Sequence, residues 1–113
     1  MPCIQTRTNV EISPQTEKSL KSKFGKAIEL LPGKSESWLM LSFEGNSHLY
    51  FQGTGEPAAF VNVEIFGKAD GTSYNRMTAS ITKILGEELA IKPSRIYVRY
   101  GETEHWGWNG NNF

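Results

Sequence analysis

The chain has 113 residues, and its 12 basic and 12 acidic side chains leave no formal net charge, which argues against a nucleic-acid or anionic-membrane binder. This length fits one domain, predicted over residues 1–113, and 38% hydrophobic residues suffice for a packed core. No apolar run reaches the ~20 residues that cross a bilayer, and a single cysteine, Cys3, excludes an intrachain disulfide and a zinc site of several thiolates.

The first half of the chain predicts a strand, a helix and a second strand. Residues 3–8 favour a short strand, and Ser13 followed by Pro14 signals a helix start, because a hydroxyl caps free amides and proline suits the first turn. An apolar stripe at helical spacing follows, formed by Leu20, Phe24, Ala27, Ile28 and Leu31. Residues 37–43 are apolar at both alternating sets of positions, which predicts a strand covered on both faces.

A glycine-containing loop over residues 45–57 separates the two halves. Within it, the stretch LYFQG at residues 49–53 resembles a tag-cleavage site. Ser47 stands where such a site needs Glu, so we interpret the stretch as native sequence.

The second half repeats the plan of the first. Residues 58–66 predict a strand, residues 70–73 offer helix caps, and residues 95–100 alternate apolar and polar positions as a strand does. The second helical stripe comprises Tyr74, Met77, Ile81, Ile84, Leu85 and Leu89. The halves, about 1–56 and 57–113, match at a shift of about 59 positions, which indicates an internal repeat.

Each half has a connection long enough to hold a helix, so its two strands are expected to be parallel, with a right-handed crossover. Two such units predict an α+β fold, a two-layer α/β sandwich in which both helices cover one face of a four-stranded sheet. Strands that are apolar on both sides would leave the other face bare. We therefore expect another copy of the chain to cover that face.

Searches for familiar catalytic motifs fail in this sequence: it has no phosphate-binding glycine loop, dinucleotide fingerprint, zinc-protease motif or serine-hydrolase motif. His48 and His105 stand alone in polar loops, and Cys3 is interpreted as a packed thiol. Pro2 remains, since removal of Met1 would make it a free secondary amine. Burial or a nearby cation lowers the pKa of such an amine, and a neutral amine is a competent general base. By residue type alone, a proline without any role is the simpler reading.

Segments spread over the whole chain resemble the macrophage migration inhibitory factor family, to which D-dopachrome tautomerase is related. They are residues 1–6 (MPCIQT), 32–34 (PGK), 56–57 (EP), 66–68 (FGK), 95–98 (RIYV) and 107–113 (GWNGNNF). The resemblance implies the tautomerase fold and a ring-shaped homotrimer with active sites between neighbouring subunits. It also implies keto–enol tautomerisation of small planar enol or keto acids, such as phenylpyruvate and dopachrome, without a cofactor or a metal.

The resemblance further implies roles for individual residues. Pro2 takes the position of the catalytic amino-terminal proline, and Lys34 that of the lysine that meets the substrate carboxylate or the developing enolate oxygen. Phe66 stands at an aliphatic pocket position, next to a backbone amide that donates to substrate. Tyr97 matches a pocket tyrosine from an adjacent subunit. The pocket rim would be formed by Trp38, Trp106, Trp108 and Phe113.

Three departures from the family pattern bear on substrates. Arg99 replaces a pocket asparagine, and this added cation either favours carboxylate substrates or blocks ligands sized for asparagine. Trp106 is bulkier than the usual aliphatic residue and narrows the opening. Residues 58–61 replace a C-x-x-C pair of the vertebrate cytokine, so thiol–disulfide chemistry is not expected. For Trp38 or Trp108 alone, packing in the core is an equal alternative.

Three functions remain open from the sequence. The leading one is a tautomerase with Pro2 as general base. The second is a cytokine-like interaction protein with a receptor partner, which keeps the pocket as a secondary feature. The third is a dehalogenase or decarboxylase of the same superfamily. The N-terminus lacks the basic-then-apolar pattern of a signal peptide, so a cytoplasmic location is expected, with non-classical secretion left open.

Overall fold

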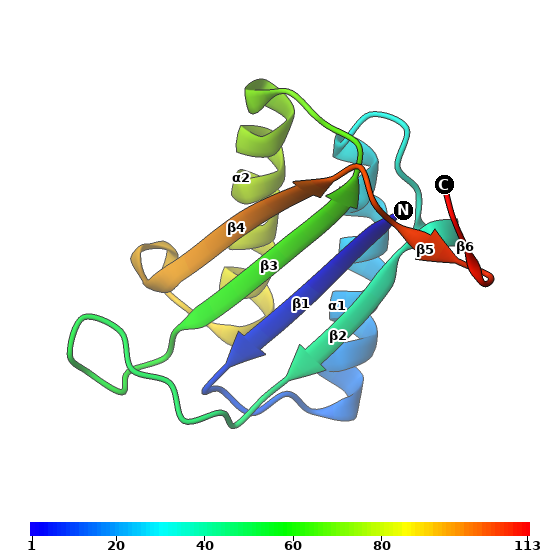
Figure 1. Cartoon of the computed structure of the whole chain (residues 1–113). Helices are drawn as coiled ribbons and strands as arrows, with labels where there is room; N and C mark the ends of the chain where they lie inside the picture. The colour runs from blue at the N-terminus through cyan, green and yellow to red at the C-terminus, as the bar shows by residue number, and fades with distance from the viewer.

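The structure, a computed structural model, describes every residue from 1 to 113. A four-stranded sheet carries both helices on one face (Figure 1). The strands are β2 (Met40–Glu44), β1 (Pro2–Thr8), β3 (Ala59–Phe66) and β4 (Ile96–Thr103), in that spatial order. β1 is parallel to β2 and β3 to β4, whereas the central strands β1 and β3 are antiparallel. The predicted two-layer α+β architecture, built from two strand–helix–strand units, is confirmed.

Both helices begin at the caps that the sequence predicts. In α1 (Pro14–Ala27), the Ser13 hydroxyl accepts a hydrogen bond from the Thr16 backbone N–H at 3.1 Å. In α2 (Gly71–Leu89), the Asp70 carboxylate accepts one from the Ser73 backbone N–H at 2.7 Å, and this bond lowers the pKa of Asp70. The two predicted stripes pack on the sheet, and every member except the half-buried Tyr74 is buried. Neither helix combines the length and hydrophobicity that a bilayer crossing requires.

The second predicted strand starts later than expected. The short 3₁₀ helix η2 (Glu36–Trp38) precedes β2, so Trp38 projects from a turn, where it is 50% exposed. The residues of β2 alternate between exposed and half-buried, so this strand is not covered on both faces. Two further 3₁₀ helices, η1 (Ile28–Leu30) and η3 (Pro93–Arg95), extend the end of α1 and precede β4.

The C-terminal segment contains a hairpin that sequence reasoning missed. β4 runs to Thr103, three residues past its predicted end, and β5 (Gly107–Trp108) then pairs with β6 (Asn111–Asn112). Asn109 and Gly110 form the turn, with φ values of 54° and 85°. Asn-Gly is the strongest short signal for a two-residue hairpin, because both turn positions need positive φ. The Asn-Gly pair is visible in the sequence, but the strands on either side of it are too short to be recognised as strands.

The face of the sheet away from the helices is mostly polar. Its side chains include Gln5, Arg7, Ser42, Glu44, Asn62, Glu64 and Arg99, with Met40, Phe60 and Tyr97 as apolar exceptions. The expectation that the strands are apolar on both sides is therefore wrong. A sheet with one polar face can be stable against water, so this pattern does not by itself require a covering subunit. The homotrimer remains a prediction from the resemblance.

A buried arginine anchors the loop between β2 and β3. Arg95 is 7% exposed and donates hydrogen bonds of 2.9–3.4 Å to the carbonyl oxygens of Phe51, Thr54, Glu56 and Pro57. Its guanidinium also lies over the Phe51 ring, 5.2 Å from the centroid. These contacts hold the loop, including the stretch that resembles a cleavage site, against the rest of the fold.

Two threonines of β1 provide a matched test of core packing. Thr6 is 2% exposed and its hydroxyl has no hydrogen-bond partner, whereas the Thr8 hydroxyl donates to the Ala58 carbonyl at 2.7 Å and accepts from the Val10 N–H at 3.1 Å. Thr6→Val should raise the free energy of unfolding by about 1 kcal/mol, because it removes an unsatisfied polar group. Thr8→Val should lower it by about 1–2 kcal/mol. Urea unfolding of both variants measures the difference, and equal destabilisation by the two would contradict this account.

Candidate active site

An open hollow of about 900 Å³ lies at the end of the sheet where β1 begins. Figure 1 shows the N-terminus, the start of β2 and the β5–β6 hairpin together at this end. The wall of the hollow draws on both halves of the chain and includes Pro2, Cys3, Trp38, Glu64, Trp106 and Trp108. Four of the residues that the resemblance assigned to a pocket therefore meet at one place: Pro2, Trp38, Trp106 and Trp108.

Pro2 is buried at the start of β1, and its nitrogen forms a peptide bond with Met1. The Met1 carbonyl oxygen accepts a hydrogen bond from the Phe66 backbone N–H at 3.0 Å. Burial lowers the pKa of the Met1 amino group, and the charge of Lys34 and a hydrogen bond with it lower that pKa further. The start of the chain thus lies in an environment that favours a neutral amine.

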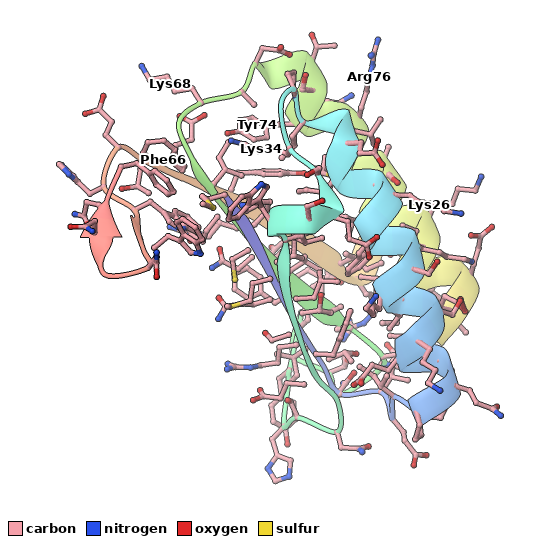
Figure 2. All side chains as sticks on the ribbon, turned by 90° about the vertical axis from the view of Figure 1, so that its right-hand side faces the viewer. Lys26, Lys34, Phe66, Lys68, Tyr74 and Arg76 are labelled. Atoms are coloured by element: carbon pink, nitrogen blue, oxygen red, sulfur yellow. The ribbon has the colours of Figure 1, made fainter.

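Lys34 approaches the start of β1 from the turn that follows α1. Gly33 has a φ of +77°, a left-handed conformation that suits glycine, and the Lys34 N–H donates to the Leu31 carbonyl at 3.1 Å. The half-buried Lys34 side chain donates from Nζ to the Phe66 carbonyl oxygen at 2.8 Å (Figure 2). Lys34 and Phe66 are separated by 32 residues, and this contact brings both to the Met1–Pro2 junction.

Four aromatic rings continue from the hollow to the C-terminus. Trp38 and Trp108 meet edge to face with centroids 5.1 Å apart, and Trp108 lies parallel to Phe113 at 6.3 Å. Phe113 in turn contacts Phe66 at 5.4 Å. Trp38, Trp108 and Phe113 are each at least half exposed, so they do not pack in the core. These rings form an aromatic wall suited to stacking on a planar ligand.

The remaining residues of the hollow modify its chemistry. Trp106 is half-buried and fills part of the wall, and His105 lies exposed beside it. Cys3 points onto the open face, where it is half-buried, so the thiol that we interpreted as packed is packed only in part. Burial, and then the charge of Glu64, raise the pKa of the Cys3 thiol. A raised pKa leaves less of the reactive thiolate, which disfavours Cys3 as a nucleophile.

Tyr97 lies far from the hollow within one chain. It pairs with Phe60 on β3, while Pro2 pairs with Ile65 five residues further along. At about 3.3 Å per residue, this separation is roughly 17 Å. Tyr97 is 61% exposed and packs against the Phe51 ring at 4.7 Å, beside a second, apolar hollow of about 220 Å³. A role for Tyr97 beside Pro2 therefore requires another subunit.

Arg99 also faces away from the core, on the open face of β4. It pairs in register with Asn62 and donates to the Asn62 side chain at 2.9 Å and to Glu64 at 3.3 Å. It does not line the hollow itself, yet its partner Glu64 does. No group of three or more His, Cys, Asp or Glu side chains gathers anywhere in the structure as a metal site requires.

Comparison with known proteins points to one family. The sequence profile described as "Macrophage migration inhibitory factor (MIF)" matches residues 1–113. The crystal structure of Leishmania major MIF2 shares 36% sequence identity and a TM-score of 0.93, covering 100% of this chain and 97% of that one. A macrophage migration inhibitory factor homolog of Trichuris trichiura is 30% identical over 115 residues, with full coverage of both chains. The D-dopachrome decarboxylase of Mus musculus is 27% identical, covering 94% of this chain and 90% of its own.

Proposed function

The chain belongs to the macrophage migration inhibitory factor family, and from this we propose that it is a cofactor-independent keto–enol tautomerase whose base is the amino group of Pro2. One observation carries the proposal: the Phe66 N–H and the Lys34 side chain both reach the Met1–Pro2 junction, and Met1 and Pro2 line the hollow. Removal of Met1 would free the Pro2 nitrogen and release the Phe66 N–H from its present acceptor. Base and donor would thus become available together.

The proposed reaction moves one proton and one electron pair. The neutral Pro2 nitrogen takes a proton from the carbon next to a carbonyl group, and the electron pair of the broken C–H bond shifts to form C=C and an enolate oxygen. The Phe66 N–H and the Lys34 ammonium stabilise the charge on that oxygen. The protonated Pro2 then gives its proton to the enolate oxygen, which forms the enol and restores the neutral base, and the reverse sequence gives the ketone. The aromatic wall holds the planar substrate and excludes water.

We propose that the active form is a homotrimer. Tyr97 stands on the open face of β4, remote from Pro2 of its own chain, as a residue that completes a neighbour's site would. The adjacent aromatic residues Phe60 and Tyr97 are exposed and offer apolar surface for such a contact.

The proposal is tested by assaying phenylpyruvate and a dopachrome ester with protein whose intact mass proves that Met1 is absent. Turnover of either substrate well above the buffer rate supports the proposal. Failure of both substrates with a folded, Met1-free oligomer would refute it.

A decarboxylation is the second candidate reaction, favoured by the name of the relative D-dopachrome decarboxylase. In that case a C–C bond to a carboxylate breaks, CO₂ leaves, the electron pair enters the conjugated system, and a proton is added later. The same donors would stabilise the same kind of enolate. Measuring CO₂ released per dopachrome consumed separates the two reactions, since a tautomerase releases none.

An interaction role is the third candidate, since most relatives bear the name macrophage migration inhibitory factor. Such a role would use the outer surface and leave the hollow secondary. A Pro2 variant that loses turnover separates the two roles.

A further inference from the structure

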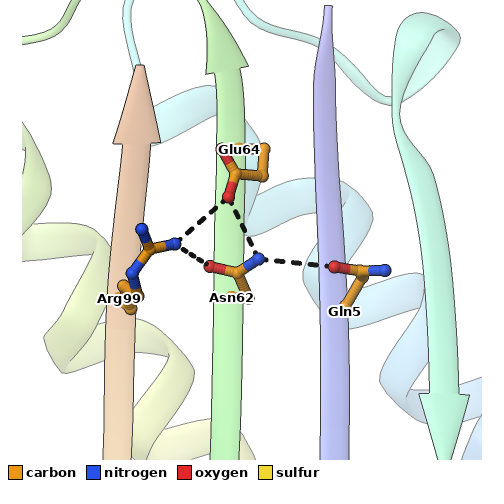
Figure 3. Close-up of polar contacts among 4 residues, drawn as sticks. All are labelled: Gln5, Asn62, Glu64 and Arg99. Carbon is orange, nitrogen blue, oxygen red and sulfur yellow. Dashed lines mark hydrogen bonds and ion pairs between the residues drawn. The ribbon is translucent and has the colours of Figure 1, made fainter. Parts of the chain in front are cut away.

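A polar network crosses the open face of the sheet beside the hollow (Figure 3). Arg99 on β4 donates from Nη1 to Asn62 Oδ1 at 2.9 Å and to Glu64 Oε1 at 3.3 Å. Asn62 donates from Nδ2 to Glu64 Oε1 at 3.1 Å and to Gln5 Oε1 on β1 at 3.3 Å. The network therefore links a residue of the hollow's wall, Glu64, to a cation on the edge strand β4.

Glu64 is an unfavourable group for the proposed reaction. It places a carboxylate in the wall of a hollow that would receive anionic keto acids and develop an enolate. Like charges at short range repel each other, more strongly where water is partly excluded. Glu64 pairs in register with Cys3, the residue next to Pro2, and after burial its charge is the second cause that raises the pKa of the Cys3 thiol. A site built for anions needs this charge offset.

Two features of β4 draw the Glu64 carboxylate away from β1. Gly101 pairs in register with Glu64, and a Cβ placed on Gly101 would collide with the carboxylate, so the missing side chain supplies the space that the carboxylate occupies. Arg99 lies two residues earlier on the same face of β4 and pairs with the carboxylate there. Gly101 makes the space on the β4 side, and Arg99 supplies the compensating charge.

We propose that Arg99 is a specificity-determining residue that acts through Glu64: it neutralises the carboxylate over Gly101 and so allows the hollow to bind planar arylcarboxylates. The inference rests on the proposed function only for the class of substrate. It differs from a direct contact between Arg99 and the substrate, which would not depend on Glu64.

Tryptophan fluorescence gives a binding readout confined to the hollow. The chain has three tryptophans, and all of them line it: Trp38, Trp106 and Trp108. The probes are trans-cinnamate and its uncharged methyl ester, which present the same planar ring and side chain with and without charge. The measured quantity is the ratio of ester to carboxylate dissociation constants, with calorimetry as a second method. Neither probe turns over, so the result does not depend on catalysis.

Arg99→Ala should reduce the preference for the carboxylate about fivefold, the effect expected of a partly exposed ion pair. Gly101→Ala should act in the same direction while keeping Arg99, because its methyl group pushes the carboxylate back toward β1. Glu64→Gln should increase the preference, and adding Arg99→Ala to Glu64→Gln should change it less than twofold. Arg7→Ala is the charge-matched control, since Arg7 pairs with Glu44 on the same face but outside the hollow.

Three results would overturn the inference: no carboxylate binding by the unaltered protein at millimolar concentration, an unchanged preference in both the Arg99 and Gly101 variants, or an equal loss on Arg99→Ala with and without Glu64. The last result would indicate that Arg99 contacts the ligand directly. A folded, Met1-free oligomer that turns over neither phenylpyruvate nor the dopachrome ester, yet shows the expected changes in carboxylate preference, would refute the proposed function and leave this inference standing.

Discussion

Replacing Pro2 by Gly in protein without Met1 is expected to lower kcat/KM for phenylpyruvate by about 10²–10⁴-fold, the usual contribution of a positioned general base. The reason is local: Pro2 is buried at the start of β1 and lines the hollow, and its ring restricts the orientation of its nitrogen. Glycine leaves a primary amine on a flexible backbone, so the lone pair is less well oriented and its ammonium form is better hydrated. Steady-state kinetics on mass-verified protein measures the loss.

A second variant removes the base altogether. Inserting one alanine between Met1 and Pro2 keeps the proline but makes its nitrogen an amide without a basic lone pair, so no turnover above buffer is expected. Pro14→Gly is the control, because Pro14 lies in the first turn of α1, on the helical face of the sheet. Full activity of the alanine-inserted protein would remove Pro2 from the mechanism.

The same variants separate the catalytic role from an interaction role. A receptor or cell response that survives Pro2→Gly while turnover is lost would make the outer surface, and not the hollow, the biologically important part. A response that disappears with turnover supports the tautomerase as the function. Far-ultraviolet circular dichroism and the oligomer mass confirm that the compared proteins share one fold.

Local signals in this chain predicted local structure well. Ser13 caps α1, Asp70 caps α2, and the two apolar stripes pack on the sheet, because cap and stripe depend on residues within a few turns of each other. The predicted strand boundaries were wrong where tertiary packing decides them. Residues with a strand-like composition form the 3₁₀ helix η2, so Trp38 lies outside the sheet. Asn62 and Glu64, at alternating positions of β3, already indicated a polar face, but the apolar composition of the whole strand concealed it.

The candidate site is less accessible to sequence reasoning than the fold. Pro2, Lys34 and Phe66 have no shared motif, and only the pairing of β1 with β3 and the turn after α1 bring them together. These three residues were grouped only because the chain resembles a family; their spacing in the sequence did not indicate that they lie together. The role of Glu64 was missed, since a lone carboxylate in a strand gives no signal until its register with Gly101 is known.

Replacing Lys34 by Met is expected to reduce kcat/KM for phenylpyruvate about 10²-fold and to move the rising limb of its pH profile to higher pH. The first effect follows from loss of an ammonium that lies beside the Phe66 backbone, 2.8 Å from its carbonyl oxygen. The second follows from charge: after burial, Lys34 is the next cause that lowers the pKa of the Met1 amino group, and the Pro2 amine freed by Met1 removal would lie near the same cation. Removal of Lys34 is therefore expected to raise the pKa of the Pro2 amine. A base works only when neutral, so more of it is inactive at pH 7.

Lys26→Met provides the matched control for this charge effect. Lys26 lies exposed near the end of α1, and Figure 2 places it well apart from Lys34 and Phe66. Both variants lose one positive charge, so a general change in net charge would shift both pH profiles equally. A shift of the pH profile that occurs only in Lys34→Met would show that the effect is local to Lys34. Lys34→Arg should restore most of the original midpoint of the pH profile, because the positive charge returns. Equal shifts for the two methionine variants would mean that Lys34 has no specific effect on the pKa of the amine. The proposed role of Lys34 as the cation that keeps the base neutral would then be wrong.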